Sequence, residues 1–309
     1  MDNFGVIVTA PDRDGSLAWD EHFGIHYRSA DAILTHPRFG DARLAYFDHL
    51  NRIYGDNPFL NKLMMQGGRM MLFFLIICLA TGYREDDRAT WPTLANLQRA
   101  LKPMRLASDG HISQLVERML QVGFLSAGAS PVDARVRLLT PAPAMLAHDQ
   151  DWLAAHYAPL AVLYGNDAYA RPLGRDRAFQ AAQRMIAAQA FAHLAAPMLS
   201  NPIILFFGHR DAAFLILTNL AGAASRAGGN EATVPYAELA RRYSVSRTHV
   251  RRLLAEAEAN DWVTVDGRAR HVVTLRPTLW QALDQFIAEG MSNHDRTGRA
   301  AERYLLAQP

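Results

Sequence analysis

The chain contains very little cysteine. Cys78 is the only cysteine among 309 residues, so no disulfide can form within the chain. It lies inside an apolar run, which predicts a buried and unreactive thiol. The first residues lack a basic segment followed by an apolar stretch, so they predict no secretory signal. Because disulfide-free chains are typical of reducing compartments, we expect a cytoplasmic protein.

Long apolar runs are also scarce. The longest covers residues 70–80, whereas a membrane-spanning helix needs about 20 apolar residues. The corresponding segment of the second half, residues 211–221, contains Asp211, Thr218 and Asn219. Both segments are therefore expected to be buried core helices, and we expect no contact with a membrane.

The sequence lacks the short motifs of common catalytic and cofactor sites. It has no glycine-rich dinucleotide fingerprint, no phosphate-binding loop, no nucleophile elbow and no His-Glu-x-x-His. His22 and His26 have the i, i+4 spacing of a metal-binding pair on a helix, but no third ligand is evident. We therefore expect neither an enzyme nor a bound cofactor or metal.

Lysine is nearly absent as well, since Lys62 and Lys102 are the only lysines among 32 basic residues. Arginine forks fit phosphates and guanine edges, although a high-GC genome that favours arginine codons is the plainer explanation. The net charge is only +2, so overall charge indicates no particular partner.

What the chain does contain is an internal repeat. Residues 108–125 return as residues 246–263 without gaps, and both copies then reach an Asp-x-Arg-x-Arg string, at 133–137 and at 266–270. Each copy predicts a helix-turn-helix followed by a β-hairpin wing. Two such copies in one chain suggest a fused form of a DNA-binding dimer.

The repeat extends upstream of these units. An Asn-Pro step at residues 57–58 matches one at 201–202, and each follows a predicted long helix, at 41–54 and at 175–194. We expect a mainly α protein with two winged helix-turn-helix domains and short β-wings, joined by long helices in a pseudo-twofold arrangement. The expected segments are an N-terminal extension with one helix around 19–27 (1–40), the first half (41–164), the second half (165–290) and a C-terminal tail (291–309) that is polar at first and helical near 299–306.

The second helix-turn-helix has the clearer DNA-reading pattern. Ser246 is a good N-cap for its second helix. The spacing of apolar residues predicts a buried face made of Val250, Leu253, Leu254 and Ala257. The outer face, which in such helices meets base edges in the major groove, then carries Arg247, Thr248, Arg251 and Arg252. A solvated helix face is the alternative for this arginine run.

The first copy is less basic. Its outer face includes Ser113 and Gln114, which can contact DNA, but also Asp109 and Glu117, which repel phosphates unless they read a cytosine amine. Its buried face is predicted to be Ile112, Leu115, Val116 and Met119. Weaker DNA binding, a different half-site and loss of DNA contact remain as alternatives for this half.

The predicted wings place arginines where a narrow minor groove would attract them. Ordinary exposed hairpin arginines are the alternative. These residues are Arg135 and Arg137 in the first wing, and Arg268 and Arg270 in the second.

Residues 116–125, followed by Asp133-Ala134-Arg135 and Leu139-Thr140, resemble the MarR family of bacterial regulators. The resemblance implies a winged-helix fold, control of transcription, relief of repression by a small ligand, and wing arginines at Arg135 and, by the repeat, Arg268. The chain is about twice the usual length of that family, which favours a fused tandem.

Aromatic residues gather in the closing helix of the first half. They are candidates for an effector pocket, although half-buried core aromatics are the plainer interpretation. These candidates are Trp152, His156, Tyr157 and Tyr164.

Together these features predict a regulator of transcription that binds double-stranded DNA sequence-specifically, responds to a small-molecule effector, and acts as a monomer through its internal symmetry. A plasmid replication initiator with two winged helices and a winged-helix protein-interaction scaffold are the alternatives.

Overall fold

The computed structural model describes residues 17–105, 107–189, 199–266 and 272–308. Over these residues the chain is mainly α-helical, with two two-stranded sheets and one three-stranded sheet, all antiparallel. The predicted class, mainly α with short strands, is confirmed.

The first described residues form a hairpin. β1 (Leu17–Asp20) pairs antiparallel with β2 (Ile25–Arg28), and the short helix α1 (Ala30–Leu34) follows. The helix expected around residues 19–27 is therefore wrong. Gly24 adopts φ +60° in the connection, a left-handed conformation that a helix does not contain. Trp19 faces His26 across the hairpin, with ring centroids 4.7 Å apart, so His22 and His26 do not share a helix face.

The first half consists of a long helix, a helical corner, a helix pair, a hairpin and a closing helix. α5 precedes α6 in the helix pair, and β3 pairs antiparallel with β4. The elements in order are α2 (Phe39–Tyr54), α3 (Pro58–Met64), α4 (Gly67–Thr81), the 3₁₀ turn η1 (Arg88–Thr90), α5 (Leu94–Leu101), η2 (Lys102–Met104), α6 (Asp109–Gln121), β3 (Leu125–Ala129), β4 (Arg137–Pro141) and α7 (Pro143–Tyr164).

The second half repeats this order, and β5 adds a third strand so that its sheet has the order β5-β7-β6. The elements are η3 (Asp167–Tyr169), α8 (Ala170–Leu173), α9 (Arg177–Gln189), α11 (Pro202–Gly208), α12 (Ala213–Arg226), β5 (Glu231–Thr233), α13 (Tyr236–Tyr243), α14 (Arg247–Ala259), β6 (Val263–Asp266), β7 (Val272–Leu275) and α15 (Pro277–Leu306).

The two Asn-Pro steps start corresponding helices, as the sequence predicts. The side-chain oxygen of Asn57 accepts a hydrogen bond from Leu60 N–H at 3.1 Å and so caps α3. Asn201 caps α11 in the same way through Ile204 N–H, also at 3.1 Å. In both helices the proline lies in the first turn, where its missing N–H removes no helical hydrogen bond.

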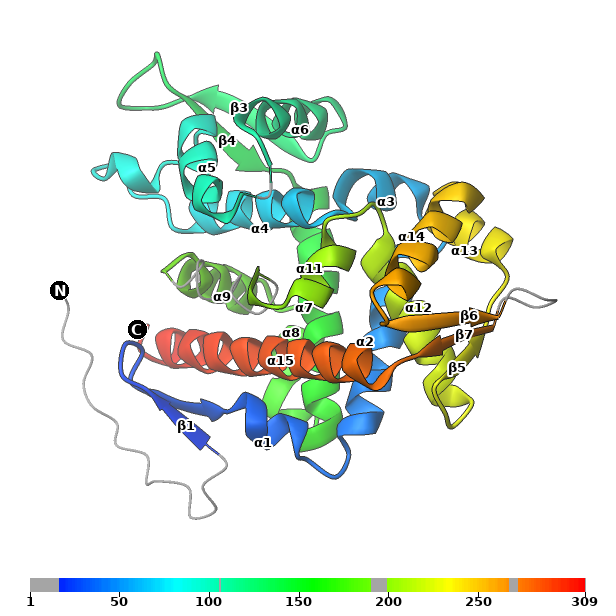
Figure 1. Cartoon of the computed structure of the whole chain (residues 1–309). Coiled ribbons are helices and arrows are strands. Elements are labelled where there is room, and N and C mark those ends of the chain that lie inside the picture. Colours follow the sequence, from blue (N-terminus) through cyan, green and yellow to red (C-terminus); the bar gives the residue numbers. More distant parts are fainter. Residues whose placement is uncertain (1–16, 106, 190–198, 267–271, 309) are drawn as a thin grey trace.

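The long helices of the two halves pack across each other. α2 packs against α7 of its own half and against α12 of the second half, while α9 packs against α15 of its own half and against α4 of the first. Each long helix therefore contacts the apolar helix of the other half, and a large buried core joins both. Figure 1 shows the α5–α6 unit at the top and the α13–α14 unit at the right, both at the outside of this helical body.

The apolar helix α4 is part of the core, as predicted. Leu72, Phe73 and Ile76 are fully buried, and burial raises the pKa of the Cys78 thiol to about 12, so the thiol stays protonated. No single helix in the described ranges has the length and apolar composition to cross a membrane. Two pairs reach that length and composition only when joined, and they bend by 85° and 114°: Pro58–Met64 with Gly68–Thr81, and Pro202–Gly208 with Ala213–Arg226.

α15 is one continuous helix of 30 residues, so the helix expected near 299–306 is present, but a separate polar tail from residue 291 does not form. The polar side chains of this segment bond inside the protein. Asp295 is 1% exposed and accepts hydrogen bonds from Arg28 N–H and from the Tyr169 hydroxyl, both at 2.7 Å. These hydrogen bonds to Asp295 anchor α15 to the N-terminal hairpin and to η3.

α15 crosses α7 at a glycine. A Cβ added to Gly298 would lie 2.5 Å from the hydroxyl oxygen of Tyr157, a residue that is 1% exposed and that donates a hydrogen bond to His294 O. We expect Gly298→Ala to lower the free energy of unfolding by about 1–3 kcal/mol in urea denaturation, because the tyrosine ring has no room to move. Gly290→Ala on the same helix is the control, since its Cβ would meet nothing within 4 Å. Equal losses in both variants would contradict the close contact.

Candidate nucleic-acid interface and interior cavity

Helices α6 and α14 begin with the same cap. The Ser108 hydroxyl oxygen accepts a hydrogen bond from His111 N–H at 3.3 Å, and the Ser246 hydroxyl oxygen accepts one from His249 N–H at 3.0 Å. Both helices contain 13 residues. These caps satisfy N–H groups that the first turn of a helix leaves without partners.

The two helices also end alike. Gly123 follows α6 with φ +74°, and Asp261 occupies the matching position after α14 with φ +56°. In both, the next residue donates its N–H to the carbonyl five residues back, at 2.9 and 3.0 Å. The sequence repeat is therefore also a repeat of backbone geometry, with a strained aspartate where the first copy has glycine.

The buried faces of both helices are those that the sequence predicts. α5 packs against α6, and α13 packs against α14, so the opposite face of each second helix is left toward solvent. The buried residues are Ile112, Leu115, Val116 and Met119 in α6, and Val250, Leu253, Leu254 and Ala257 in α14.

The outer face of α14 is basic. Arg247, Thr248, Arg251 and Arg252 are all exposed, and the first turn contains no acidic residue. Arg252 lies 3.7 Å from Glu256 one turn later, whereas no residue of the described ranges forms an ion pair with Arg247 or Arg251. The positive end of the helix dipole adds to this charge. The surface therefore favours an anionic partner.

The arginines of α13 are used differently. The Arg241 guanidinium forms an ion pair with Asp56 of the first half, and Asp56 N–H donates to Arg242 O at 2.9 Å. The Arg242 guanidinium lies over the Tyr243 ring, 5.9 Å from its centroid. The ion pair and the backbone hydrogen bond fasten α13 to the corner before α3, whereas Arg247 and Arg251 of α14 remain exposed to solvent.

Of the two residues of α6 that were predicted to contact DNA, Ser113 forms hydrogen bonds inside the protein and Gln114 is exposed. The Ser113 hydroxyl donates to Asp109 O at 2.9 Å and accepts a hydrogen bond from Gln98 Nε2 at 3.2 Å, which connects α6 to α5. Gln114 is exposed, but so are Asp109 and Glu117 on the same helix. This face therefore suits a phosphate backbone less well than the outer face of α14.

The β3–β4 hairpin presents Arg135 near its turn, with 91% of the side chain exposed. Arg135 Nε lies 3.1 Å from Asp133, and Arg88 donates to the same carboxylate at 2.9 Å. Hydrogen bonds from Arg135 and Arg88 lower the pKa of Asp133 and keep it ionised. Arg137 begins β4 and is exposed. Outside the described residues lie the wing arginines predicted for the second half, Arg268 and Arg270.

The corner between α11 and α12 contacts α14 directly. Arg210 donates a hydrogen bond to Glu256 at 2.7 Å, and His249 Nε2 lies 3.0 Å from Asp211 O. Both α14 residues lie within two turns of the exposed arginines. These two contacts connect the corner to α14.

The same corner meets the α3–α4 corner of the first half. Ala212 N–H donates to Met65 O at 2.7 Å, and Gln66 Nε2 donates to His209 O at 3.3 Å. The corners that follow the two Asn-Pro helices are thus joined by hydrogen bonds between the halves.

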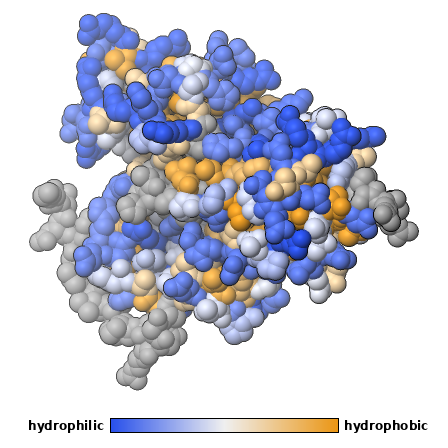
Figure 2. Space-filling model, in the orientation of Figure 1, coloured by the Kyte–Doolittle hydropathy of each residue, from blue (hydrophilic) through white to orange (hydrophobic). Residues whose placement is uncertain are grey.

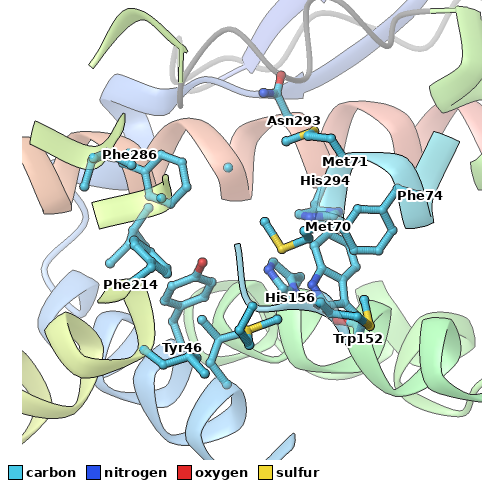
Figure 3. Close-up of a pocket in the computed structure, with 18 of the residues that line it drawn as sticks. Tyr46, Met70, Met71, Phe74, Trp152, His156, Phe214, Phe286, Asn293 and His294 are labelled. Atoms are coloured by element: carbon cyan, nitrogen blue, oxygen red, sulfur yellow. Dashed lines mark hydrogen bonds between the residues drawn. The ribbon is translucent and has the colours of Figure 1, made fainter. Parts of the chain in front are cut away.

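Beside these corners lies an interior cavity of about 190 Å³ that is partly open to the surface. Figure 3 shows rings and thioethers from α4, α7, α12 and α15 facing one space, with the Tyr46 hydroxyl of α2 pointing into it. Figure 2 shows hydrophobic side chains gathered at the centre of the molecular face around α11, which supplies part of the wall. The apolar lining includes Met64, Met65, Met70, Met71, Phe74, Trp152, Phe207, Phe214, Phe286 and Met291.

The structure places two of the four predicted effector residues at this cavity. Trp152 and His156 line it and stack with ring centroids 3.6 Å apart. Tyr157 and Tyr164 are not among the lining residues. Tyr157 is buried beside α15, and Tyr164 packs edge-on against His36 with centroids 5.4 Å apart.

Most of the lining residues could not be predicted from the sequence because they come from distant segments. One feature of the sequence did indicate a binding site. Met64, Met65, Met70 and Met71 occur within eight residues around the α3–α4 corner. Methionine is flexible and polarisable, and such clusters are typical of adaptable binding surfaces.

A buried ion pair borders the cavity. The side chains of Arg184 and Asp149 are 5% and 0% exposed, and Arg184 Nε donates to Asp149 at 3.0 Å. Gln180 Nε2 donates to the same carboxylate at 2.8 Å. The Arg184 guanidinium lies 4.9 Å from the Phe74 ring centroid and 5.1 Å from that of Trp152. Because the two charges compensate each other, the pair adds little net charge to the cavity.

Two histidines of the lining are held neutral. His156 Nδ1 donates to Trp152 O at 2.8 Å, which leaves its Nε2 as an acceptor. Burial lowers the pKa of His156 to about 3. Burial also lowers the pKa of His294, and the proximity of His156 lowers it further.

We expect acid to destabilise the fold through these histidines. The pKa of His156 is about 3 in the folded chain against an ordinary 6.5, so below pH 6.5 the unfolded chain binds a proton that the folded chain does not. Stability should therefore fall with decreasing pH by about 1.4 kcal/mol per pH unit for each such histidine. Urea denaturation at pH 7 and pH 5 measures this loss.

His156→Gln is expected to lose less stability between these two pH values than the natural chain. His22→Gln, at an exposed position, should match the natural chain. An unchanged pH dependence in the His156 variant would show that this histidine is not held neutral.

The described side chains contain no group of three His, Cys, Asp or Glu residues that could hold a metal ion. The described residues thus provide a basic helix face and a neutral, thioether-rich cavity, which the α11–α12 corner connects. Comparison with known proteins gives no relative: no protein-family model, no curated protein and no solved structure matches this chain.

Proposed function

We propose that this chain binds double-stranded DNA sequence-specifically and regulates transcription. The observation that carries the proposal is the outer face of α14, where Arg247, Thr248 and Arg251 are exposed near the start of the second helix of a pair. In helix-turn-helix proteins this part of the second helix meets base edges in the major groove. Arginine forks suit both guanine edges and phosphates.

Each half would supply one winged helix-turn-helix. In this proposal α5 and α6 with the β3–β4 wing form the first, and α13 and α14 with the β6–β7 wing form the second. The shared caps of α6 and α14 support a common origin, and the reciprocal packing of α2 with α12 and of α9 with α4 supports a fused pseudo-twofold dimer. One chain in the cytoplasm would then hold two readers, which in symmetric dimers contact half-sites about 34 Å apart or a multiple of it.

The two readers would bind with unequal strength. α14 combines exposed arginines with a first turn free of acid, whereas α6 exposes Asp109 and Glu117 beside Gln114. We expect α14 to provide most of the affinity and the first half to recognise a different half-site. The surface charge therefore favours a site without perfect symmetry.

Selection of bound DNA from a random double-stranded library tests this function. A defined motif should be enriched, and affinity for it should fall steeply as the salt concentration rises, because bound arginines release counterions from the phosphates. Failure to enrich any sequence, together with salt-independent binding, would contradict the proposal and favour a protein-interaction scaffold.

The arrangement of the selected motif separates two DNA-binding roles. An inverted pair of unequal half-sites would fit a regulator built as a fused dimer. Direct repeats, located on plasmids beside an origin, would instead indicate a replication initiator.

A further inference from the structure

Gln183 lines the interior cavity, its amide orientation is fixed, and its oxygen has no donor among the described residues. The Thr297 hydroxyl donates to Asn293 O at 2.8 Å, so its oxygen must accept the hydrogen bond from Gln183 Nε2 at 3.0 Å. That bond fixes the amide of Gln183, a residue that is 1% exposed. Gln183 Oε1 is then a buried acceptor with no hydrogen-bond partner among the described residues.

Two more acceptors of the lining are fixed in the same manner. Gln66 Nε2 donates to His209 O, and its Oε1 is buried without a partner in the described part of the chain. His156 donates from Nδ1 to Trp152 O, so its Nε2 carries a lone pair. Buried acceptors without donors are costly, so the cavity favours an occupant that donates hydrogen bonds.

The cavity also limits the charge and size of that occupant. Arg184 is compensated by Asp149 and Arg210 by Glu256, and both lining histidines are neutral, so neither a cation nor an anion gains a counter-charge. The volume of about 190 Å³ is somewhat larger than the roughly 150 Å³ apolar cavity that is known to hold benzene. One ring or two fused rings fit this space.

We infer that the cavity binds a neutral aromatic compound of one or two rings that carries an N–H or O–H donor. The rings would lie among the thioethers and aromatic side chains that Figure 3 shows around the space, including Met70, Phe74 and Phe286. The donor would bond to Gln183 Oε1 or His156 Nε2. Methionine side chains adapt their shape to such a ligand at little cost.

Occupation of the cavity is expected to change the position of α14. Phe207 of α11 and Arg210 of the α11–α12 corner are among the residues that line the cavity. Arg210 also donates to Glu256 of α14, at 2.7 Å. This regulatory step rests on the proposed DNA-binding function, whereas binding of the compound does not.

Calorimetric titration of the full chain without DNA tests the binding. Indole is the probe, because it is neutral, has two fused rings and carries one N–H. Benzothiophene is the matched probe of similar shape without a donor. Indole should bind saturably, and benzothiophene should bind roughly tenfold more weakly because it leaves the acceptors unpaired.

Two variants locate the site. Gly290 lines the cavity and a Cβ there meets nothing within 4 Å, so Gly290→Met should fill the space and abolish indole binding without unfolding the chain. Gly40→Met is the control, since Gly40 is an exposed glycine of α2 with equal room. Gln183→Met should reduce the preference for indole over benzothiophene and leave benzothiophene binding in place.

Three results would overturn the inference: no saturable binding of indole, equal binding in Gly290→Met, or equal affinity for both probes, as expected if water alone satisfies the acceptors. DNA titrations with and without indole then test regulation separately. A chain that binds indole but no DNA retains the ligand site and contradicts the proposed function. A chain that binds both independently contradicts only the coupling through the corner.

Discussion

Replacing Arg247 and Arg251 together with alanine is expected to weaken binding to the selected DNA by about 2–6 kcal/mol. Each arginine that reads a base contributes about 1–3 kcal/mol. Neither side chain has an ion-pair partner within the described ranges, so the substitution removes a DNA contact without leaving an unpaired acid. Fluorescence anisotropy at one fixed salt concentration measures the loss.

The control is Arg177→Ala, which removes one positive charge, half of what the double variant loses, from an exposed position at the start of α9. Figure 1 places α9 at the side of the helical body away from α14. If the double variant weakened binding no more than this control does, α14 would not be the reading helix. Gln114→Ala tests α6 in the same way, and we expect it to weaken DNA binding only slightly.

Replacing Asp149 with alanine is expected to lower the free energy of unfolding by about 3–5 kcal/mol, because it leaves the buried Arg184 guanidinium without a counter-charge. Gln180 also loses its carboxylate partner. The measurement is urea denaturation near neutral pH.

A surface ion pair on the same helix provides the control. Asp151 lies two residues later and pairs with Arg175, but these side chains are 49% and 54% exposed, so Asp151→Ala should cost at most about 1 kcal/mol. Combining Asp149→Leu with Arg184→Met should recover most of the lost stability, because neither charge is then left buried. If Asp149→Ala and Asp151→Ala lowered the free energy of unfolding equally, burial of the ion pair would not explain the cost.

The features that could be predicted from the sequence depend on nearby residues. Ser108 and Ser246 cap their helices, and the apolar residues spaced along α6 and α14 form their buried faces, as predicted. The Asn-Pro steps start α3 and α11 for the same local reason. A cap or a helical stripe involves residues within one or two turns, so the local sequence contains all the partners.

The predictions that failed involve partners far along the chain. Trp19 and His26 form a hairpin rather than a helix, and the hairpin lies against α15, more than 250 residues later. The polar residues after 291 look like a tail until Asp295 meets Arg28 and Tyr169. Pairings over such distances cannot be read from local periodicity.

The amino-acid sequence by itself determined the two-fold repetition, the helix boundaries near each cap, and which arginines face away from the core of α14. Only the tertiary structure decided that the corners of the two halves meet, that a cavity opens beside them, and that Gln183, Gln66 and His156 line it with their hydrogen-bond orientations fixed. The physical reason is that a cap or a buried stripe is satisfied within one helix, whereas a cavity exists only where helices from both halves fail to fill the space between them.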